Sequence, residues 1–330
     1  MFSVRKDGIG KMLTAAILVL LMQLTRLPAP GQDHSSPQAP AGEYTISIDA
    51  GLVVLPVFVT DRKGSAVPGL REDSFRVFED GRPQPIALFE AEDVRVTAGL
   101  VLDNSSSMGA KRREVLAAAE GFATSSNHQD QMFVVSFNQT VSMGLRRGEG
   151  FTSDVQELLS AVSRAPARGK TALYDGVAAA LRHLRAGTAS RKTLIVISDG
   201  GDNASRLSFR QLLQQAESSN AQIYTIGLID ENFAGDNAGG LSKLARVTGG
   251  QAYFPTSPAA IPGICREIAR NLRQQYTLGY HPSGSSLGGK YHAIRVTATA
   301  TGGGKLRVFT RSGYLVPGET PSPIRAEAQL

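Results

Sequence analysis

The chain has 330 residues, of which 42% are hydrophobic and 19% charged, so it can bury a core and is not a disordered protein. The formal net charge is +6 at pH 7, but residues 1–31 contribute +3 of it, through Arg5, Lys6, Lys11 and Arg26 against Asp7. The remaining charges are mixed along the chain, which excludes an extended basic surface for nucleic acid.

The N-terminus has the pattern of a signal peptide. Three basic residues precede a 13-residue apolar stretch, residues 12–24. A helix of that length spans about 20 Å, less than the roughly 30 Å hydrocarbon core of a bilayer. We therefore expect residues 1–31 to be a signal peptide, cleaved before Gln32, and the protein to be exported, either periplasmic or secreted. An uncleaved segment that anchors the protein in the membrane is the alternative.

A single cysteine, Cys265, excludes an internal disulfide, so packing must stabilise the exported chain. Cys265 shares a helical spacing with apolar neighbours, which predicts a buried side chain. Residues 32–43 are polar and rich in proline, and we expect a linker there.

Residues 44–93 and 274–317 both have the pattern of short strands separated by turns. The first segment contains the runs "YTISIDA", "LVVLPVFVT", "SFRVFED" and "PIALFEA", with "EDGRPQP" as a predicted turn, and the second contains "QQYTLGYHP", "KYHAIRVTATA" and "KLRVFTRSGYLV". Neither segment alone has the roughly seven strands of a sandwich. We expect the two to pack together or side by side as a small β-sandwich-like domain, followed by a tail at 318–330.

Between these segments, residues 94–273 alternate apolar strand-like runs with amphipathic helical patterns. The strand-like runs are 96–102, 132–137, 193–198 and 223–228. Runs this apolar are covered on both faces, and their alternation with helices predicts an α/β fold, a doubly wound and mostly parallel sheet inserted between the flanking β segments. Such sheets place their ligands outside the carboxyl ends of the strands.

Polar residues stand at those ends. Asp103, Ser105 and Ser107 follow the first strand with D-x-S-x-S spacing, Thr171 lies in the turn of "GKTALYDG" before a helix, and Asp199 follows the strand of "TLIVISDGGDN". Alternate residues of an extended turn point the same way, so the first three side chains can converge. Carboxylate and hydroxyl oxygens are hard donors that suit a small dication such as Mg²⁺.

This combination of D-x-S-x-S, a later threonine and an aspartate after a buried strand resembles the metal-ion-dependent adhesion site of von Willebrand factor type A (VWA) domains, over residues 94–272. The flanks "VTDRKGSAVPGLREDSFRVFEDGRPQPI", "YTLGYHPS" and "GKYHAIRV" resemble exported bacterial proteins with a VWA-related domain. The resemblance implies a VWA or Rossmann-like fold and a bound Mg²⁺, Mn²⁺ or Ca²⁺. It implies direct ligation by Ser105 and Ser107, with Asp103, Thr171 and Asp199 binding directly or through water.

One position departs from the resembled site. Ser106 stands where these domains commonly have glycine, and we expect it to tighten the loop backbone. Asp175 and Asp202 lie near the site in sequence and are candidates to orient waters or backbone amides, although surface or helix-end roles fit them equally well.

The predicted function is binding without catalysis. The resemblance implies that the ion accepts an acidic side chain of a protein or peptide partner, with a membrane as partner only if the N-terminal segment stays uncleaved. A structural envelope component with a non-functional ion site is one alternative. A metal-assisted hydrolase is another, disfavoured because the three loops contain no histidine or glutamate to act as a general base. The histidines form no H-E-x-x-H motif, so their spacing does not indicate a zinc site.

Overall fold

The structure is a computed structural model and describes residues 51–91, 93–229, 234–283, 290–300 and 306–315. These residues all belong to one compact unit, 43–330. The predicted signal peptide, the linker, the strand at 44–50 and the tail at 318–330 lie outside the described residues. Within the described ranges, each helix lacks the length or the apolar character needed to cross a bilayer.

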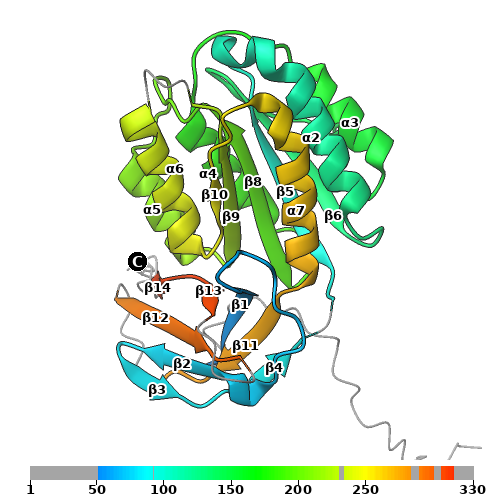
Figure 1. The fold of residues 1–330 in the computed structure, drawn as a ribbon. Helices are drawn as coiled ribbons and strands as arrows, with labels where there is room; N and C mark the ends of the chain where they lie inside the picture. Colours follow the sequence, from blue (N-terminus) through cyan, green and yellow to red (C-terminus); the bar gives the residue numbers. More distant parts are fainter. Residues whose placement is uncertain (1–50, 92, 230–233, 284–289, 301–305, 316–330) are drawn as a thin grey trace, which may run out of the picture. The chain divides into compact units, whose positions relative to one another are not determined.

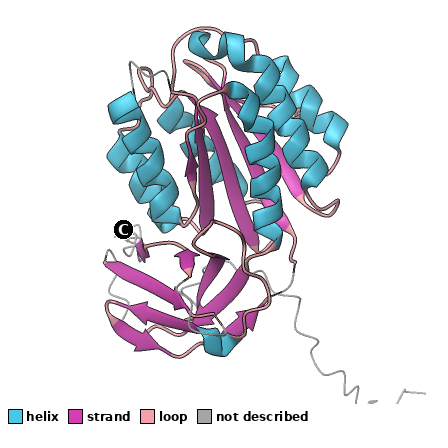
Figure 2. Cartoon of the chain, viewed as in Figure 1, coloured by secondary structure: helices cyan, strands magenta, loops and turns pink. Residues whose placement is uncertain are grey.

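The middle of the chain forms a six-stranded sheet with strand order β10-β9-β8-β5-β6-β7 (Figure 1). Its strands are β5 (Val96–Asp103), β6 (Gln131–Phe137), β7 (Val141–Met143), β8 (Arg191–Ser198), β9 (Ala221–Gly227) and β10 (Ala252–Tyr253). Neighbouring strands are parallel, except that β7 is antiparallel to β6. All residues of β5, β8 and β9 are buried, because helices cover both faces (Figure 2). The predicted mostly parallel sheet is confirmed.

Amphipathic helices provide that cover. They are α2 (Arg112–Ser125), α3 (Val155–Arg164), α4 (Leu173–Leu184), α5 (Phe209–Ser218), α6 (Ala234–Thr248) and α7 (Ile261–Arg273), with short 3-10 segments η3 (Ser106–Lys111) and η5 (Pro258–Ala260). In Figure 1, α2 and α7 lie side by side in front of the sheet and α4 lies behind it. The apolar stripe of α7 includes Cys265, which is buried as predicted. Burial raises the pKa of its thiol to about 12.

The flanking segments form two four-stranded antiparallel sheets, with orders β13-β1-β11-β4 and β14-β12-β2-β3. The elements are β1 (Val53–Thr60), η2 (Glu72–Ser74), β2 (Phe75–Glu79), β3 (Arg82–Gln84), β4 (Leu88–Glu90), β11 (Tyr276–Tyr280), β12 (Tyr291–Ala298), β13 (Arg307–Phe309) and β14 (Gly313–Leu315). In each sheet a strand from before the middle domain pairs with one from after it, β1 with β11 and β2 with β12. The predicted packing of the two segments is confirmed.

The structure differs from two local predictions in this region. The turn predicted over "EDGRPQP" is confined to Asp80 and Gly81, which both have positive φ (48° and 81°), and the chain then returns as the strand β3 of a hairpin. The last predicted run forms two strands, β13 and β14, in different sheets. Arg311 lies between them with its side chain buried, and it donates hydrogen bonds to the carbonyl oxygens of Gly313 and Glu217, which diverts the chain.

Arg191, the first residue of β8, joins the six-stranded sheet to the strands that follow α7. Its buried guanidinium donates to the carbonyl oxygens of Leu272 and Gln275 and to Thr277 Oγ1. Burial lowers the pKa of Arg191 to about 10, so the group stays charged at neutral pH. The domain boundaries predicted at 93/94 and 273/274 stay predictions.

Candidate metal centre

The carboxyl end of β5 is a topological switch point of the sheet. The chain passes from β5 to β6 on one side, and β8 later pairs with the other side of β5. Because these strands are parallel, their carboxyl ends meet at one edge, where connections that leave in opposite directions open a crevice. Asp103 is the last residue of β5 and Asp199 directly follows β8. Topology therefore brings both predicted carboxylates to this edge.

Asp103 has a buried carboxylate held by two donors. Its Oδ1 accepts the backbone N–H of Ser105 at 2.8 Å, and its Oδ2 accepts the hydroxyl of Ser198 at 2.6 Å. Burial raises the pKa of the Asp103 carboxyl above its ordinary value, and the hydrogen bonds from Ser105 and Ser198 oppose that rise. The side chain is thus fixed in one orientation before any cation binds.

The two serine hydroxyls and Asp199 form a continuous run of oxygen atoms. Ser105 Oγ lies 3.1 Å from Ser107 Oγ, and Ser107 Oγ donates to Asp199 Oδ2 across the two loops. The extended turn predicted for this loop is wrong beyond Ser105, because Ser106 begins the 3-10 segment η3. The hydroxyls nevertheless converge, since the tight first turn of η3 brings Ser107 back beside Ser105.

Thr171 lies buried in the loop that precedes α4, as the sequence predicts. Its backbone N–H donates to Asn203 Oδ1 at 2.9 Å, and its carbonyl oxygen accepts the N–H groups of Asn203 and Ala204. Two residues earlier, Gly169 exchanges two hydrogen bonds with Ser106. The loop of Thr171 is thereby fastened to the loop after β5 on one side and to the loop after β8 on the other.

Asp175 and Asp202 brace the same loops from opposite ends. Asp175 accepts the backbone N–H groups of Arg206 and Leu207 at 2.9 and 3.1 Å, and Asp202 accepts the N–H of Tyr174 at 3.3 Å. Each aspartate thus ties the start of α4 to the segment that follows β8. Both carboxylates therefore accept hydrogen bonds from backbone amides, and their part in a metal site stays a prediction.

Two residues with a part in this geometry were not predicted, Ser198 and Asn203. Ser198 directly follows the apolar run 194–197 at the end of β8 and is fully buried, so its hydroxyl needs a hydrogen-bond partner, which is Asp103. That single polar residue at the end of an apolar run was the signal available in the sequence. Asn203 gave no comparable signal, because its contact with Thr171 joins residues 32 positions apart.

Ser106, the position that departs from the resembled pattern, adds a tie between loops. Its hydroxyl accepts the N–H of Gly169 at 2.9 Å, and its own N–H donates to the Gly169 carbonyl at 3.1 Å. A glycine at this position would keep the second bond and lose the first. The expected tightening of the loop therefore takes the form of one side-chain hydrogen bond.

A family model, the von Willebrand factor type A domain, matches residues 99–267, just over half of the 330-residue chain. This chain belongs to the von Willebrand factor type A domain family. The matched range begins inside β5 and ends inside α7, so it includes all three loops of the candidate metal centre. The fold expected from the sequence and its family are both confirmed.

Several solved structures are similar to the chain at low identity. A von Willebrand factor type A protein from Catenulispora acidiphila has 15% identity over 76% of each chain, with a TM-score of 0.48. The vWF domain of the type V pili tip protein Mfa5 from Porphyromonas gingivalis has 16% identity over 55% of this chain and 95% of that one, with a TM-score of 0.46. BatB from Bacteroides thetaiotaomicron has 16% identity over 53% and 98%, with a TM-score of 0.42. The comparison with curated proteins found no match.

The donor set of this VWA domain fits a hard dication. Two carboxylates and three hydroxyls supply oxygen atoms alone, which is the ligand class of Mg²⁺ and its relatives and not of zinc. Asp103 and Ser105 are buried, whereas Ser107 is exposed, so the cluster opens to solvent on one side. The residues that could hold an ion are Asp103, Ser105, Ser107, Thr171 and Asp199.

Proposed function

We propose that this VWA domain is the metal-dependent binding module of an exported protein, and that its ion accepts an acidic side chain from a protein or peptide partner. The observation that supports the proposal is the oxygen contact between Ser107 and Asp199, which joins loops 92 positions apart. Hydroxyl and carboxylate oxygens gathered from separate loops, beside the buried carboxylate of Asp103, are what a small dication needs.

The ligand roles follow from burial and existing contacts. Ser105 and Ser107 offer neighbouring hydroxyl oxygens and bind the ion directly. Both carboxylate oxygens of Asp103 already accept a hydrogen bond, so Asp103 binds through its remaining lone pairs or through water. Thr171 and Asp199 complete the set, directly or through water, with Mg²⁺ as the first choice and Mn²⁺ or Ca²⁺ as substitutes.

Charge balance explains why the partner is acidic. Two aspartates neutralise a dication, and neutral hydroxyls then leave it electron-poor. Mg²⁺ takes about six oxygen ligands, so five protein ligands leave one position for an outside oxygen. Because Ser107 is exposed, that position faces solvent, where a carboxylate from a partner can reach it. The three loops contain no histidine or glutamate as a general base, which supports binding over catalysis.

The first test is Mg²⁺ binding to the full chain by calorimetry. We expect one site that is lost in Asp199→Ala and kept in Asp154→Asn. The control removes one carboxylate from the exposed N-cap of α3, where asparagine caps equally well. Binding that is absent from the unmodified chain, or unchanged in Asp199→Ala, would overturn the ion site.

The second test addresses the partner. A displayed peptide library is selected on the protein in Mg²⁺ and eluted with chelator. We expect the selected peptides to contain Asp or Glu, and to lose binding when that residue is changed to its amide or when Asp199→Ala replaces the unmodified protein. Selection of peptides without any acidic residue, on a protein that does bind Mg²⁺, would contradict the acidic partner and leave the ion site standing.

A further inference from the structure

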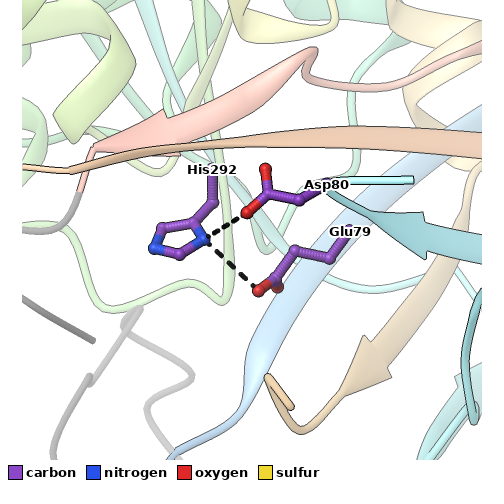
Figure 3. Close-up of side chains that lie close together, drawn as sticks. All are labelled: Glu79, Asp80 and His292. Atoms are coloured by element: carbon purple, nitrogen blue, oxygen red, sulfur yellow. Dashed lines mark hydrogen bonds and ion pairs between the residues drawn. The ribbon is translucent and has the colours of Figure 1, made fainter. Parts of the chain in front are cut away.

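A second cluster of metal-ligating side chains lies in the β-sandwich, formed by Glu79, Asp80 and His292 (Figure 3). One ligand atom from each residue lies within 4.8 Å of the other two. His292 Nδ1 is 3.0 Å from Asp80 Oδ2 and 3.4 Å from Glu79 Oε1. The side chains of His292 and Glu79 are each 6% exposed, and that of Asp80 is 40% exposed.

Strand register places these residues together. Glu79 pairs with Ile294 across β2 and β12, so His292, two residues away along β12, is the diagonal neighbour of Glu79 on the same face. Asp80 follows in the hairpin turn. Its N–H donates to the Ala293 carbonyl, and its Oδ1 accepts the Ala293 N–H at 2.9 Å.

Both carboxylates are oriented by protein donors on their far oxygens. Glu79 Oε2 accepts the hydroxyls of Tyr280 at 2.5 Å and Tyr314 at 3.3 Å, and Asp80 Oδ1 is held by the backbone of Ala293. The remaining oxygens, Glu79 Oε1 and Asp80 Oδ2, both face the same imidazole nitrogen, as Figure 3 shows. The two oxygens and the imidazole nitrogen therefore lie together, and each carboxylate is held through its other oxygen.

The imidazole of His292 is also fixed in place. Its ring stacks on Tyr314 with centroids 5.3 Å apart and an interplanar angle of 19°. Its Nε2 is buried without a hydrogen-bond partner among the described residues, so the stacked ring and the contacts at Nδ1 orient it.

Charge distinguishes a metal site from an ordinary hydrogen bond. Two carboxylate oxygens face one imidazole nitrogen, Asp80 Oδ2 at 3.0 Å and Glu79 Oε1 at 3.4 Å. One Nδ1–H can donate well to only one of the two facing oxygens. A dication at that point would neutralise both carboxylates and take the Nδ1 lone pair.

We propose that Glu79, Asp80 and His292 bind a transition-metal dication, best matched by zinc, through Oε1, Oδ2 and Nδ1. Bonds of about 2.0 to 2.2 Å in a tetrahedral site separate ligand atoms by roughly 3.3 Å, close to the contacts at Nδ1. A mixed nitrogen and oxygen set favours zinc over Mg²⁺. The partial exposure of Asp80 gives the ion an entry and leaves a fourth position for water. Tyr280, Tyr314 and the Ala293 N–H supply the outer hydrogen bonds that orient metal ligands.

The test is a Zn²⁺ titration of the full chain by calorimetry, in an Asp103→Asn background so that the VWA site does not contribute. We expect one Zn²⁺ per chain. His292→Gln and Asp80→Asn should each weaken binding by at least about tenfold, and Tyr280→Phe by about 10- to 100-fold. Asparagine tolerates the positive φ of residue 80, so Asp80→Asn removes a ligand without straining the hairpin.

His281→Gln is the matched control, because His281 is an exposed histidine whose Nδ1 contacts the Gly51 carbonyl instead. It should bind Zn²⁺ as the parent does. Co²⁺ in place of Zn²⁺ should give a visible absorption band that disappears in His292→Gln. The proposal would be overturned if Zn²⁺ does not bind, or if binding survives His292→Gln and Asp80→Asn in folded protein. The cluster would then be an ion pair between His292 and the two carboxylates.

Discussion

The two candidate cation sites draw their ligands from different kinds of structure. At the carboxyl edge of the six-stranded sheet, Asp103 ends β5 and the other proposed ligands lie in loops, outside the buried apolar runs of β5 and β8. In the β-sandwich, His292 and Glu79 are members of paired strands, and their contacts reach Tyr280 and Tyr314 of the sandwich core. At the VWA edge, substitution of a ligand should therefore reduce ion binding with little change in stability. In the sandwich, substitution of a ligand or its partner should reduce both ion binding and stability.

The largest expected effect comes from the junction of the two regions. Arg191→Met should lower the free energy of unfolding by about 3 kcal/mol, because the buried carbonyls of Leu272 and Gln275 lose a charged donor. Urea denaturation measures it. Arg270→Met is the control, since Arg270 lies exposed on α7. A loss below about 1 kcal/mol would show that the two regions are held together without this residue.

Asp103→Asn tests whether ion binding and stability are separate at the VWA edge. Asparagine keeps the Oδ1 acceptor for the Ser105 N–H and removes the negative charge, and its amide N–H can donate to Ser198 Oγ in place of the bond that Oδ2 accepts. We expect the ion-free melting temperature to change little, and the stabilisation by Mg²⁺ to vanish, a loss of about 2.7 kcal/mol at a hundredfold excess over Kd. Melting curves in Mg²⁺ and in chelator test this. An unfolded variant would show that the residues at this edge are needed for the stability of the domain.

Tyr280→Phe tests the sandwich in the same way. Burial, and the neighbouring Glu79, raise the pKa of the Tyr280 hydroxyl, so it remains a donor at neutral pH. Its removal leaves a buried carboxylate with one donor fewer, and we expect a loss of about 1 to 2 kcal/mol in unfolding free energy together with weaker Zn²⁺ binding. Tyr291→Phe, on an exposed tyrosine, is the control. If Zn²⁺ binding is lost while stability is unchanged, binding and stability are separate in the sandwich too, and the two sites do not differ in this respect.

Ser106→Ala is expected to have the smallest effect. It removes the hydrogen bond to the Gly169 N–H and keeps the backbone bond in the other direction, so about 1 kcal/mol or less of stability should be lost. Mg²⁺ affinity should fall only slightly, because Ser106 is not a ligand. Ser153→Ala, another exposed serine, serves as control in both measurements. A large loss of Mg²⁺ affinity would mean that this tie positions the ligand loops.

The strands of the VWA sheet were predictable because burial on both faces leaves an unbroken apolar run. The predicted strand 96–102 is β5, Val96–Asp103, and the others agree to within two residues at each end. The short strands β7 and β10 left no such run, since three or two residues become a strand only through pairing with a neighbour. The strand β3 was included in the predicted turn because it is three residues long and contains Pro83.

The sequence by itself determined the alternation of strands and helices and the edge of the sheet at which Asp103 and Asp199 lie. It could do so because parallel strands end on one side of their sheet, whatever their order. Only the tertiary structure decided that Ser198 holds Asp103 and that His292 faces Asp80, 212 positions away. Such contacts depend on the register between distant strands, which packing sets and residue spacing does not reveal.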